Sequence, residues 1–238
     1  MFRGDVDGKT LTFERIGLKG SNFFMRDRET ESHWQQINGE CFEGPLKGKR
    51  LEMLPFLLTT WGEWREVHPE TLALLPEPAY KANYEVMAKR NTNLPSSESP
   101  GRGVIRQDSR LPPHEQVMGI EVGGKHKAYP LPFLRKQPVL NDQVGTSSIV
   151  VVHNEAGETT TVFSRVVNGR TLVFHEASPG VVNTLIDDQT HSRWTPYGEC
   201  TAGKMKGQKL DTIVPLPSFW FAWAEFYPDT QIYSTPTR

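Results

Sequence analysis

The sequence predicts a mainly β protein, a β-rich α+β fold of two homologous β modules, each with a short Trp-containing helix near its carboxyl end. Three observations predict this fold: strand-like runs are joined by glycine turns, the same motifs occur twice in one order, and each set ends in two tryptophans spaced for one helical face. Residues 91–101 are poor in large apolar residues and rich in turn formers, which is typical of a surface linker. We therefore assign residues 1–80 to a first module, 81–111 to a linker and 112–238 to a second module.

The internal repeat is a series of stretches that match in the same order. The matching pairs are 6–13 and 167–174, 27–34 and 187–194, 39–41 and 198–200, 47–51 and 206–210, 61–64 and 220–223, and 68–71 and 227–230. Because the period is far too long for a solenoid, we interpret the pattern as a duplicated domain. Phe2 aligns with Phe163 at the end of a strand, so we expect the first module to lack the strands that begin the second.

Turn residues mark the predicted hairpins, since both central residues of a type I′ turn need positive φ, which Asn, Asp and Gly tolerate. The turns are Asp7-Gly8, Gly123-Gly124, residues 154–157 and Asn168-Gly169. The strand at Phe2 has no predicted neighbour upstream, and an unpaired edge is a surface that folded proteins cover. We therefore expect a homo-oligomer or a protein partner that pairs with this first strand.

Each module ends in one short predicted helix. In the first module Thr60 is placed to cap the helix and Glu63 to complete a capping box, while Trp61 and Trp64 share one face. Pro69 favours a helix end at the residue before it. Paired tryptophans at this spacing are typical of core anchors, and we expect that role in both modules.

Composition predicts a soluble, packed protein and argues against two classes of partner. A formal net charge of -1 and a pI near 6.7 leave no basic excess to neutralise a nucleic-acid backbone. The chain has no run of about 18 apolar residues that could span a membrane. It also shows no leader, so the compartment stays open, with export expected if the native amino terminus is missing.

The two cysteines, Cys41 and Cys200, occupy equivalent positions of the two modules. A disulfide framework needs more cysteines, and a thiolate zinc site usually places a pair two to four residues apart. We interpret both as small buried residues. A bridge between the modules is the alternative.

The sharpest local motif is Asp-x-x-Thr-x-Ser-x-Trp, which begins at Asp27 and again at Asp187. An Asp at the start of a tight turn accepts backbone N–H groups two or three residues further on. We expect the Thr and Ser hydroxyls to point outward and the Trp to fill the core. The alternative is a ligand-binding site that uses the carboxylates of Asp27 and Asp187 together with those hydroxyls.

The second module carries further polar candidates for a ligand-binding site. They are His126, Asn141, Asp142, His153 and His175. Imidazole and carboxylate groups bind metal ions and transfer protons, but these residues lack a recognised ligand spacing such as two histidines four apart on a helix. An ordinary surface or core role is the competing interpretation for each histidine.

Several segments resemble the family catalogued as domain of unknown function 3179. The segments are 112–120, 128–131, 139–145, 168–174 and 26–36. The likeness covers nearly all of 112–238 and most of 2–75. The resemblance identifies a family about whose function little is established.

The resemblance implies a metal or redox site whose motifs this chain replaces. Family members carry a His-Glu pair just before the Val-Asn-Asp segment and a Cys-Pro-Leu-Cys motif at the end of the next strand. Here the first pair reads Gln137-Pro138, and the two cysteine positions are Asn154 and Gly157. The corresponding segment of the first module would lie upstream of Met1.

We therefore expect a non-catalytic β-rich tandem domain with a binding or assembly role and no cofactor. The alternative is a metal-dependent or redox enzyme. Its divergent site would hold a transition metal between Asp142, His126, His153 and His175.

Overall fold

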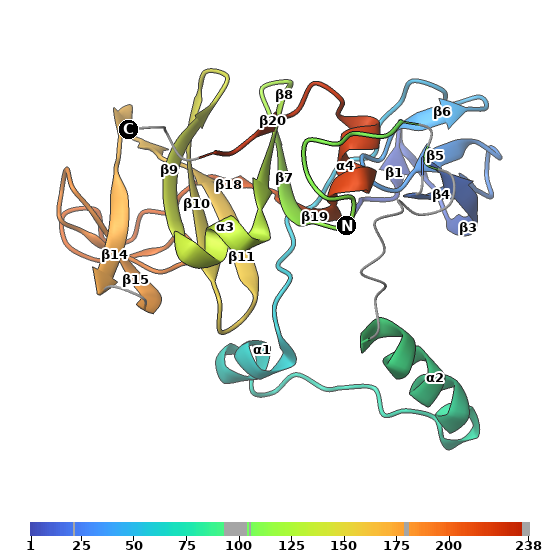
Figure 1. Ribbon diagram of the computed structural model, residues 1–238, viewed down its shortest axis with the longest axis horizontal. Helices are drawn as coiled ribbons and strands as arrows, with labels where there is room; N and C mark the ends of the chain where they lie inside the picture. Colours follow the sequence, from blue (N-terminus) through green and yellow to red (C-terminus); the bar gives the residue numbers. More distant parts are fainter. Residues whose placement is uncertain (21, 93–103, 105, 179–180, 235–238) are drawn as a thin grey trace.

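Two β regions and an arm between them make up the computed structural model, which describes residues 1–20, 22–92, 104, 106–178 and 181–234 (Figure 1). We call residues 1–54 the first lobe, 55–92 the arm, and the described part of 106–234 the second lobe. In the described chain the strands pair antiparallel except for one parallel pair. The expected mainly β fold is confirmed.

The first lobe consists of a hairpin and a four-stranded antiparallel sheet. The hairpin joins β1 (Asp5–Val6) to β2 (Lys9–Thr10), and the sheet has the order β3 (Phe13–Lys19), β4 (Asn22–Asp27), β5 (His33–Gln35), β6 (Cys41–Glu43). Trp34 and Cys41, both fully buried, lie in its core.

The second lobe contains a hairpin and a sheet with the same order of strands. The hairpin joins β12 (Val166–Val167) to β13 (Arg170–Thr171), and the sheet has the order β14 (Phe174–Ser178), β15 (Val181–Asp187), β16 (Arg193–Trp194), β17 (Cys200–Ala202). Trp194 and Cys200 occupy its core as Trp34 and Cys41 do in the first lobe.

Two further sheets are found in the second lobe. One has the order β18 (Thr212–Ile213), β11 (Thr159–Ser164), β10 (Ser147–Asn154), β9 (Val139–Val144). The other has the order β19 (Leu216–Phe219), β7 (Gln116–Val122), β8 (Lys125–Pro130), β20 (Gln231–Ile232). The short helix α3 (Leu131–Lys136) follows β8 directly.

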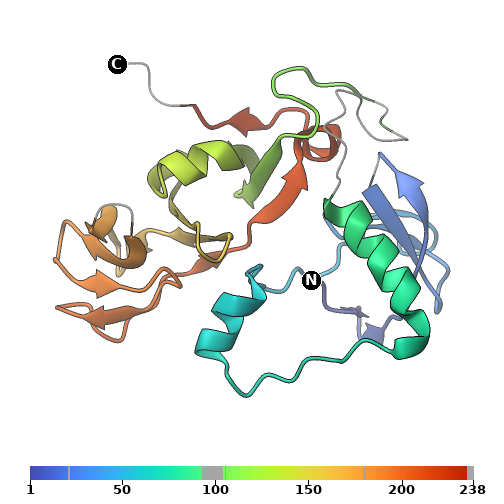
Figure 2. The same cartoon turned by 60° about the horizontal axis from the view of Figure 1, so that its bottom comes forward.

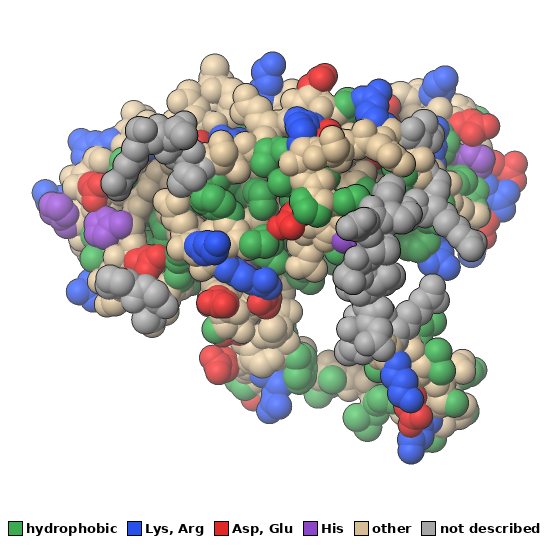
Figure 3. Space-filling model, in the orientation of Figure 1, with side chains coloured by type: hydrophobic (Ala, Val, Ile, Leu, Met, Phe, Trp, Pro, Cys, Tyr) green, Lys and Arg blue, Asp and Glu red, His purple; other side chains and the backbone are tan. Residues whose placement is uncertain are grey.

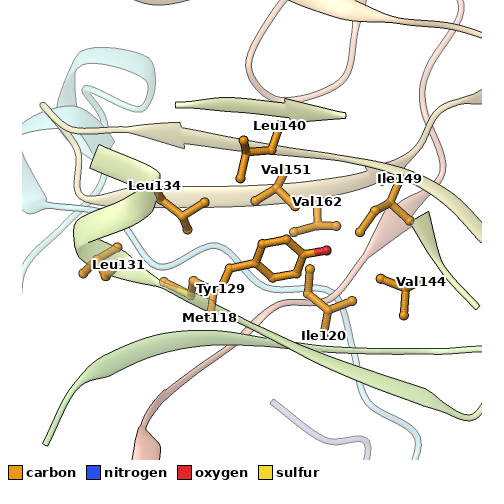
Figure 4. Packing of buried hydrophobic residues seen from close by; sticks show 10 residues of the cluster. All are labelled: Met118, Ile120, Tyr129, Leu131, Leu134, Leu140, Val144, Ile149, Val151 and Val162. Carbon is orange, nitrogen blue, oxygen red and sulfur yellow. The ribbon is translucent and has the colours of Figure 1, made fainter. Parts of the chain in front are cut away.

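Strand β10 forms the middle layer of the second lobe, because both of its faces are buried. Ile149 and Val151 face a cluster around Tyr129, whose ring Figure 4 shows among aliphatic side chains from β7, β9, β10, β11 and α3. Val150 and Val152 point the other way, into the core that holds Trp194. A run of consecutive apolar residues in β10 is therefore the pattern of a strand with two buried faces.

Helix α4 (Trp220–Phe226) packs on strand β7 through a glycine. A Cβ at Gly119 would lie 2.2 Å from the Trp223 ring, so only a residue without a side chain lets the indole approach β7. Asn22 of the first lobe donates a hydrogen bond of 3.4 Å to the Ala222 carbonyl, so α4 also contacts the first lobe (Figure 1).

The arm carries α1 (Trp61–Val67), a 3-10 turn at Pro78–Tyr80 and α2 (Lys81–Thr92), and it lies below the lobes in the view of Figure 1, with α1 nearest the second lobe (Figures 1 and 2). Thr60 caps α1 as predicted, by accepting from the Glu63 N–H. Helix α1 nevertheless has no buried residue, and Trp61 is 49% exposed. The prediction that both tryptophan pairs anchor a core is thus confirmed in α4 and wrong for Trp61.

Helix α1 and helix α4 continue in the same way. The Trp64 indole donates to the Thr71 hydroxyl at 2.9 Å, and the Trp223 indole donates to the Thr230 hydroxyl at the same distance. What differs is the support: α4 lies on β7, whereas the residues after α1, such as Leu74 at 99%, are exposed. Local sequence determines the turn, and a neighbouring strand determines whether it is buried.

The predicted linker is more ordered at its start than expected. Helix α2 covers Lys81–Thr92, within the segment 81–111 that the sequence assigns to a linker. Most of the stretch that motivated that assignment, residues 93–101, lies outside the described residues.

The predicted hairpins are confirmed. Positive φ is found at both central residues of Asp7-Gly8, Gly123-Gly124 and Asn168-Gly169, and β10 pairs with β11 across the fourth turn. The first strand forms one isolated bridge, between Phe2 and Met53. Strand β11, which contains the Phe163 that aligns with Phe2 in sequence, pairs on both sides, with β10 and with β18.

The cysteines do not form the bridge that the sequence left as an alternative. Cys41 and Cys200 are both free and buried, and they belong to the cores of different lobes. Burial raises the pKa of each thiol. Among the helices of the described residues, none has the length and apolar character needed to cross a membrane.

Candidate functional site

A cavity of about 830 Å³ lies where the arm meets the second lobe, within the range of about 300–1,000 Å³ that is usual for small-molecule sites. Its walls come from α1, the end of α3, the β10–β11 turn, β14 and β15. The lining residues are Glu63, Glu66, Arg135, Lys136, Pro138, His153, Asn154, Glu155, Ala156, Glu176, Val182 and Asn183.

His153 is the buried polar residue of this cavity. Its side chain is fully buried, and its Nδ1 lies 3.0 Å from the hydroxyl of Thr160, the residue directly opposite in the β10–β11 ladder. Its Nε2 is buried without a hydrogen-bond partner among the described residues. Burial lowers the pKa of His153, so the imidazole favours its neutral form.

Backbone hydrogen bonds hold the walls of the cavity around His153. The His153 N–H donates to the Pro138 carbonyl at 2.8 Å, which ties the end of β10 to the segment after α3. The Thr60 N–H donates to the Gly157 carbonyl at 3.1 Å, which seats the start of α1 on the β10–β11 turn. A Cβ at Gly157 would lie 2.9 Å from Glu63, so the glycine allows α1 to approach.

The charged lining is unbalanced toward carboxylates. Four glutamates line the cavity, against two basic residues, Arg135 and Lys136. The Arg135 guanidinium is paired at 2.9 Å with Glu158 on the β10–β11 turn, which offsets its charge. Figure 3 shows acidic and basic side chains gathered where α1 meets the second lobe.

Asp142 and Asn141 lie on β9 and do not reach His153. Asp142 is opposite Ile149, and His153 is four residues further along β10, about 13 Å away at about 3.3 Å per residue. Asp142 accepts hydrogen bonds from the Tyr129 hydroxyl at 2.7 Å and pairs with Lys127 at 2.6 Å.

Asn141 faces the other side of β9 and has a structural contact there. Its side-chain amide donates to the Phe174 carbonyl at 2.7 Å and accepts from the Phe174 N–H at 2.8 Å. It thereby joins β9 to β14, and both of its polar atoms are occupied.

His126 and His175 lie in other parts of the second lobe. The His126 ring packs on the Tyr227 ring, with centroids 4.3 Å apart, near Glu121. His175 pairs with Asp188 at 2.9 Å, and both side chains are about half exposed. Within the described residues, no group of three or more His, Cys, Asp or Glu side chains is arranged to hold a metal ion.

Asp27 and Asp187 are fully buried at the starts of equivalent turns. Each accepts from the backbone N–H groups and from the Trp indole of its motif, as the structural interpretation predicted. The prediction of outward hydroxyls was wrong, because the Thr190 hydroxyl donates to Asp187 and also lies 2.7 Å from the Ser192 hydroxyl. The carboxylate needs these donors because it is buried.

Comparison with protein families gives one match, to the family described as a protein of unknown function (DUF3179), over residues 1–230. The chain belongs to the DUF3179 family. That single match includes both lobes and the arm of this DUF3179 protein. Comparison with curated proteins and with solved structures found no significant match.

The positions at which this DUF3179 protein departs from the expected motifs come together in the structure. Pro138 and Asn154 both line the cavity, and Gly157 carries the contact with Thr60. The two segments at which the sequence lacks the expected motifs, 137–138 and 154–157, thus lie at the cavity that His153 lines. The imidazole remains there without thiols beside it.

Sequence reasoning selected His153 but missed its neighbours. Thr160 could have been found, because the predicted hairpin of β10 and β11 places it opposite His153. Glu63 and Glu66 could not have been found, because no local pattern indicates that α1 returns to the second lobe. Arg135 was missed because α3 was not predicted.

Proposed function

We propose that the protein is a non-catalytic binding protein and that the cavity at His153 is its ligand-binding site. The observation that carries the proposal is a fully buried imidazole in the lining of that cavity, whose Nε2 has no hydrogen-bond partner among the described residues. A buried polar atom without a partner is costly, and a bound group that completes its hydrogen bond removes the cost.

Other residues selected from the sequence have structural contacts, and this leaves His153 as the candidate for ligand binding. Asn141 joins two strands, while Asp27 and Asp187 organise turns. Asp142 lies about 13 Å along the sheet from His153, whereas the atoms that bind a metal ion lie within about 2–2.6 Å of it. In the alternative of a transition-metal or redox enzyme, Asp142 therefore could not bind the same metal ion as His153.

We further infer that the two lobes derive from one duplicated unit, with the first lobe lacking the counterpart of β7 to β10. The inference is supported by the shared strand order and by Asp27 and Asp187, which accept equivalent hydrogen bonds. It is also supported by Gly39 and Gly198, which have φ of 71° and 82° at matching positions. The arm then corresponds to the segment that follows β19.

The ligand site is tested by fragment screening of the full chain with ligand-observed NMR, using a library of cationic, anionic and neutral compounds. We expect hits that are lost in His153→Gln and retained in the matched variant His126→Gln. Glu66→Gln, on the exposed surface of α1, provides a second variant that leaves the core of the second lobe intact. Hits that survive both His153→Gln and Glu66→Gln, or no hits at all, would refute the site.

An assembly role is favoured by the arm, whose apolar residues include Leu72 at 94% and Leu74 at 99% exposure. Monomeric proteins rarely leave large apolar patches uncovered. We propose that a second copy of this chain covers the arm, because Thr60 of the arm is hydrogen-bonded to Gly157 of the second lobe, and exchange of such a segment between copies is a low-cost route to a dimer. The first strand, at Phe2, is the second surface that we expect a partner copy to use.

Light scattering coupled to size-exclusion chromatography tests the assembly role. We expect a dimer for the wild-type chain and a monomer for the double variant Leu72→Glu, Leu74→Glu. The matched control Glu70→Gln should leave the dimer intact. A wild-type chain that stays monomeric at high concentration would contradict the proposal.

A further inference from the structure

We propose that the His153 cavity binds an organic cation, an amine or guanidinium compound, whose N–H donates to His153 Nε2 while neighbouring carboxylates balance its charge. This inference rests on the proposed ligand site and names the class of compound that fits it. It follows from the imidazole, the lining charges and the position of α1 at the cavity.

The imidazole offers an acceptor to the cavity. When Nδ1 carries the proton, it donates to the Thr160 hydroxyl at 3.0 Å and leaves a lone pair on Nε2. The groups charged near His153 are Glu155 and Glu158 on the β10–β11 turn and Arg135 on α3. Because Arg135 and Glu158 are paired and offset each other, Glu155 is the uncompensated charge of these three, and a ligand that donates and carries positive charge matches it.

The carboxylates that line the cavity come from three separate segments. Glu63 and Glu66 lie on α1, Glu155 lies on the β10–β11 turn, and Glu176 lies on β14. The basic residues that line the cavity are Lys136 and Arg135, and Arg135 is paired with Glu158. The excess of carboxylates repels an anion and attracts a cation.

Ligand binding involves the arm, because two of the four glutamates belong to α1. The Thr60 to Gly157 hydrogen bond and the glycine fit at Gly157 place these carboxylates over the second lobe. Their charges also reach Tyr197 in the second lobe, whose pKa is raised by burial and then by Glu63 and Glu66. A cation in the cavity therefore bridges the arm and the second lobe.

The experiment titrates the ¹⁵N-histidine-labelled full chain with benzylamine, benzyl alcohol and benzoate, which share a ring and differ in charge. The His153 Nε2 resonance is assigned with His153→Gln. We expect the dissociation constant of benzylamine, measured from the shift of this resonance, to be at least about tenfold lower than that of benzoate, a difference of about 1.4 kcal/mol. Glu63→Gln with Glu66→Gln should weaken benzylamine about two- to fivefold, as for partly exposed charge pairs, whereas Glu70→Gln should have no effect.

Other outcomes separate the two claims. If benzyl alcohol or benzoate binds as tightly as benzylamine, as judged from the Nε2 resonance, the cation inference is wrong and the ligand site stands. If none of the three shifts Nε2, both are wrong. Zn²⁺ is titrated separately, and binding at Nε2 that is tighter than that of benzylamine would overturn the inference in favour of a metal site.

Discussion

The indole of Trp194 donates a 3.0 Å hydrogen bond to the buried carboxylate of Asp187. Trp34 and Asp27 repeat the pair at 2.7 Å in the first lobe. The contact joins the largest side chain of each core to the turn that begins its motif. A single carboxylate thus orients a tryptophan and closes a turn, which explains why the two functions recur together in both lobes.

Replacement of Asp187 by Asn should destabilise the protein by about 2–4 kcal/mol, because hydrogen bonds to a charged acceptor are lost and buried donors are left without a full partner. Chemical denaturation followed by near-UV circular dichroism measures the effect. Asp188→Asn, at the adjacent and half-exposed position, is the matched control and should change stability by less than about 0.5 kcal/mol. Equal effects at both positions would contradict this account.

Acid should destabilise the protein through the same carboxylates. Burial opposes ionisation of Asp187, but donation by Trp194, Thr190 and the Ser192 N–H outweighs it and lowers its pKa. The folded pKa is lower than the unfolded value near about 3.9, so this stability is present above the unfolded pKa and is lost as pH falls through the folded one. As the pH is lowered from about 6 to about 2, the denaturation midpoint should fall steeply for the wild type and less for Asp187→Asn.

Gly119 and Gly62 should respond to alanine substitution with opposite signs. A Cβ at Gly119 meets the Trp223 ring at 2.2 Å, so Gly119→Ala displaces α4 and should cost about 1–3 kcal/mol. Gly62 lies in the exposed helix α1, where its nearest neighbour is 3.9 Å away, so Gly62→Ala should be neutral or stabilising by up to about 1 kcal/mol. Thermal unfolding measures both, and a harmless Gly119→Ala would show that α4 does not depend on this contact.

Local chemistry made much of the fold predictable. The turn at Asn168-Gly169 needs positive φ at both positions, and Thr60 offers a capping oxygen; the structure has both features. The exposure of Trp61 was not predictable in the same way, because burial depends on what lies opposite. Helix α4 has β7 beside it, and in the described chain α1 has no equivalent strand.

The candidate site could be predicted only in part, for a similar reason. His153 was selected by residue type, and the hairpin of β10 and β11 predicts its contact with Thr160. The carboxylates of Glu63 and Glu66 reach the cavity from a segment about 90 residues earlier in the chain, a count that follows from their numbering. The hydrogen bond between Thr60 and Gly157 helps to bring the two parts together, and it has no sequence signature.

The proposed duplication predicts that a second copy of residues 112–162, joined to the first lobe, buries helix α1. Fusion of a second copy of residues 112–162 directly to Phe2 would supply counterparts of β7 to β11, because Phe2 aligns with Phe163. Helix α1 should then pack as α4 packs on β7, so acrylamide should quench Trp61 fluorescence less and the melting temperature should rise. The matched control is the same fusion with Gly119→Val in the added copy, since that side chain would collide with the indole of Trp64 as a Cβ at Gly119 collides with Trp223. If quenching of Trp61 is unchanged in the fusion, α1 is not the counterpart of α4, and the two lobes do not share one ancestral plan.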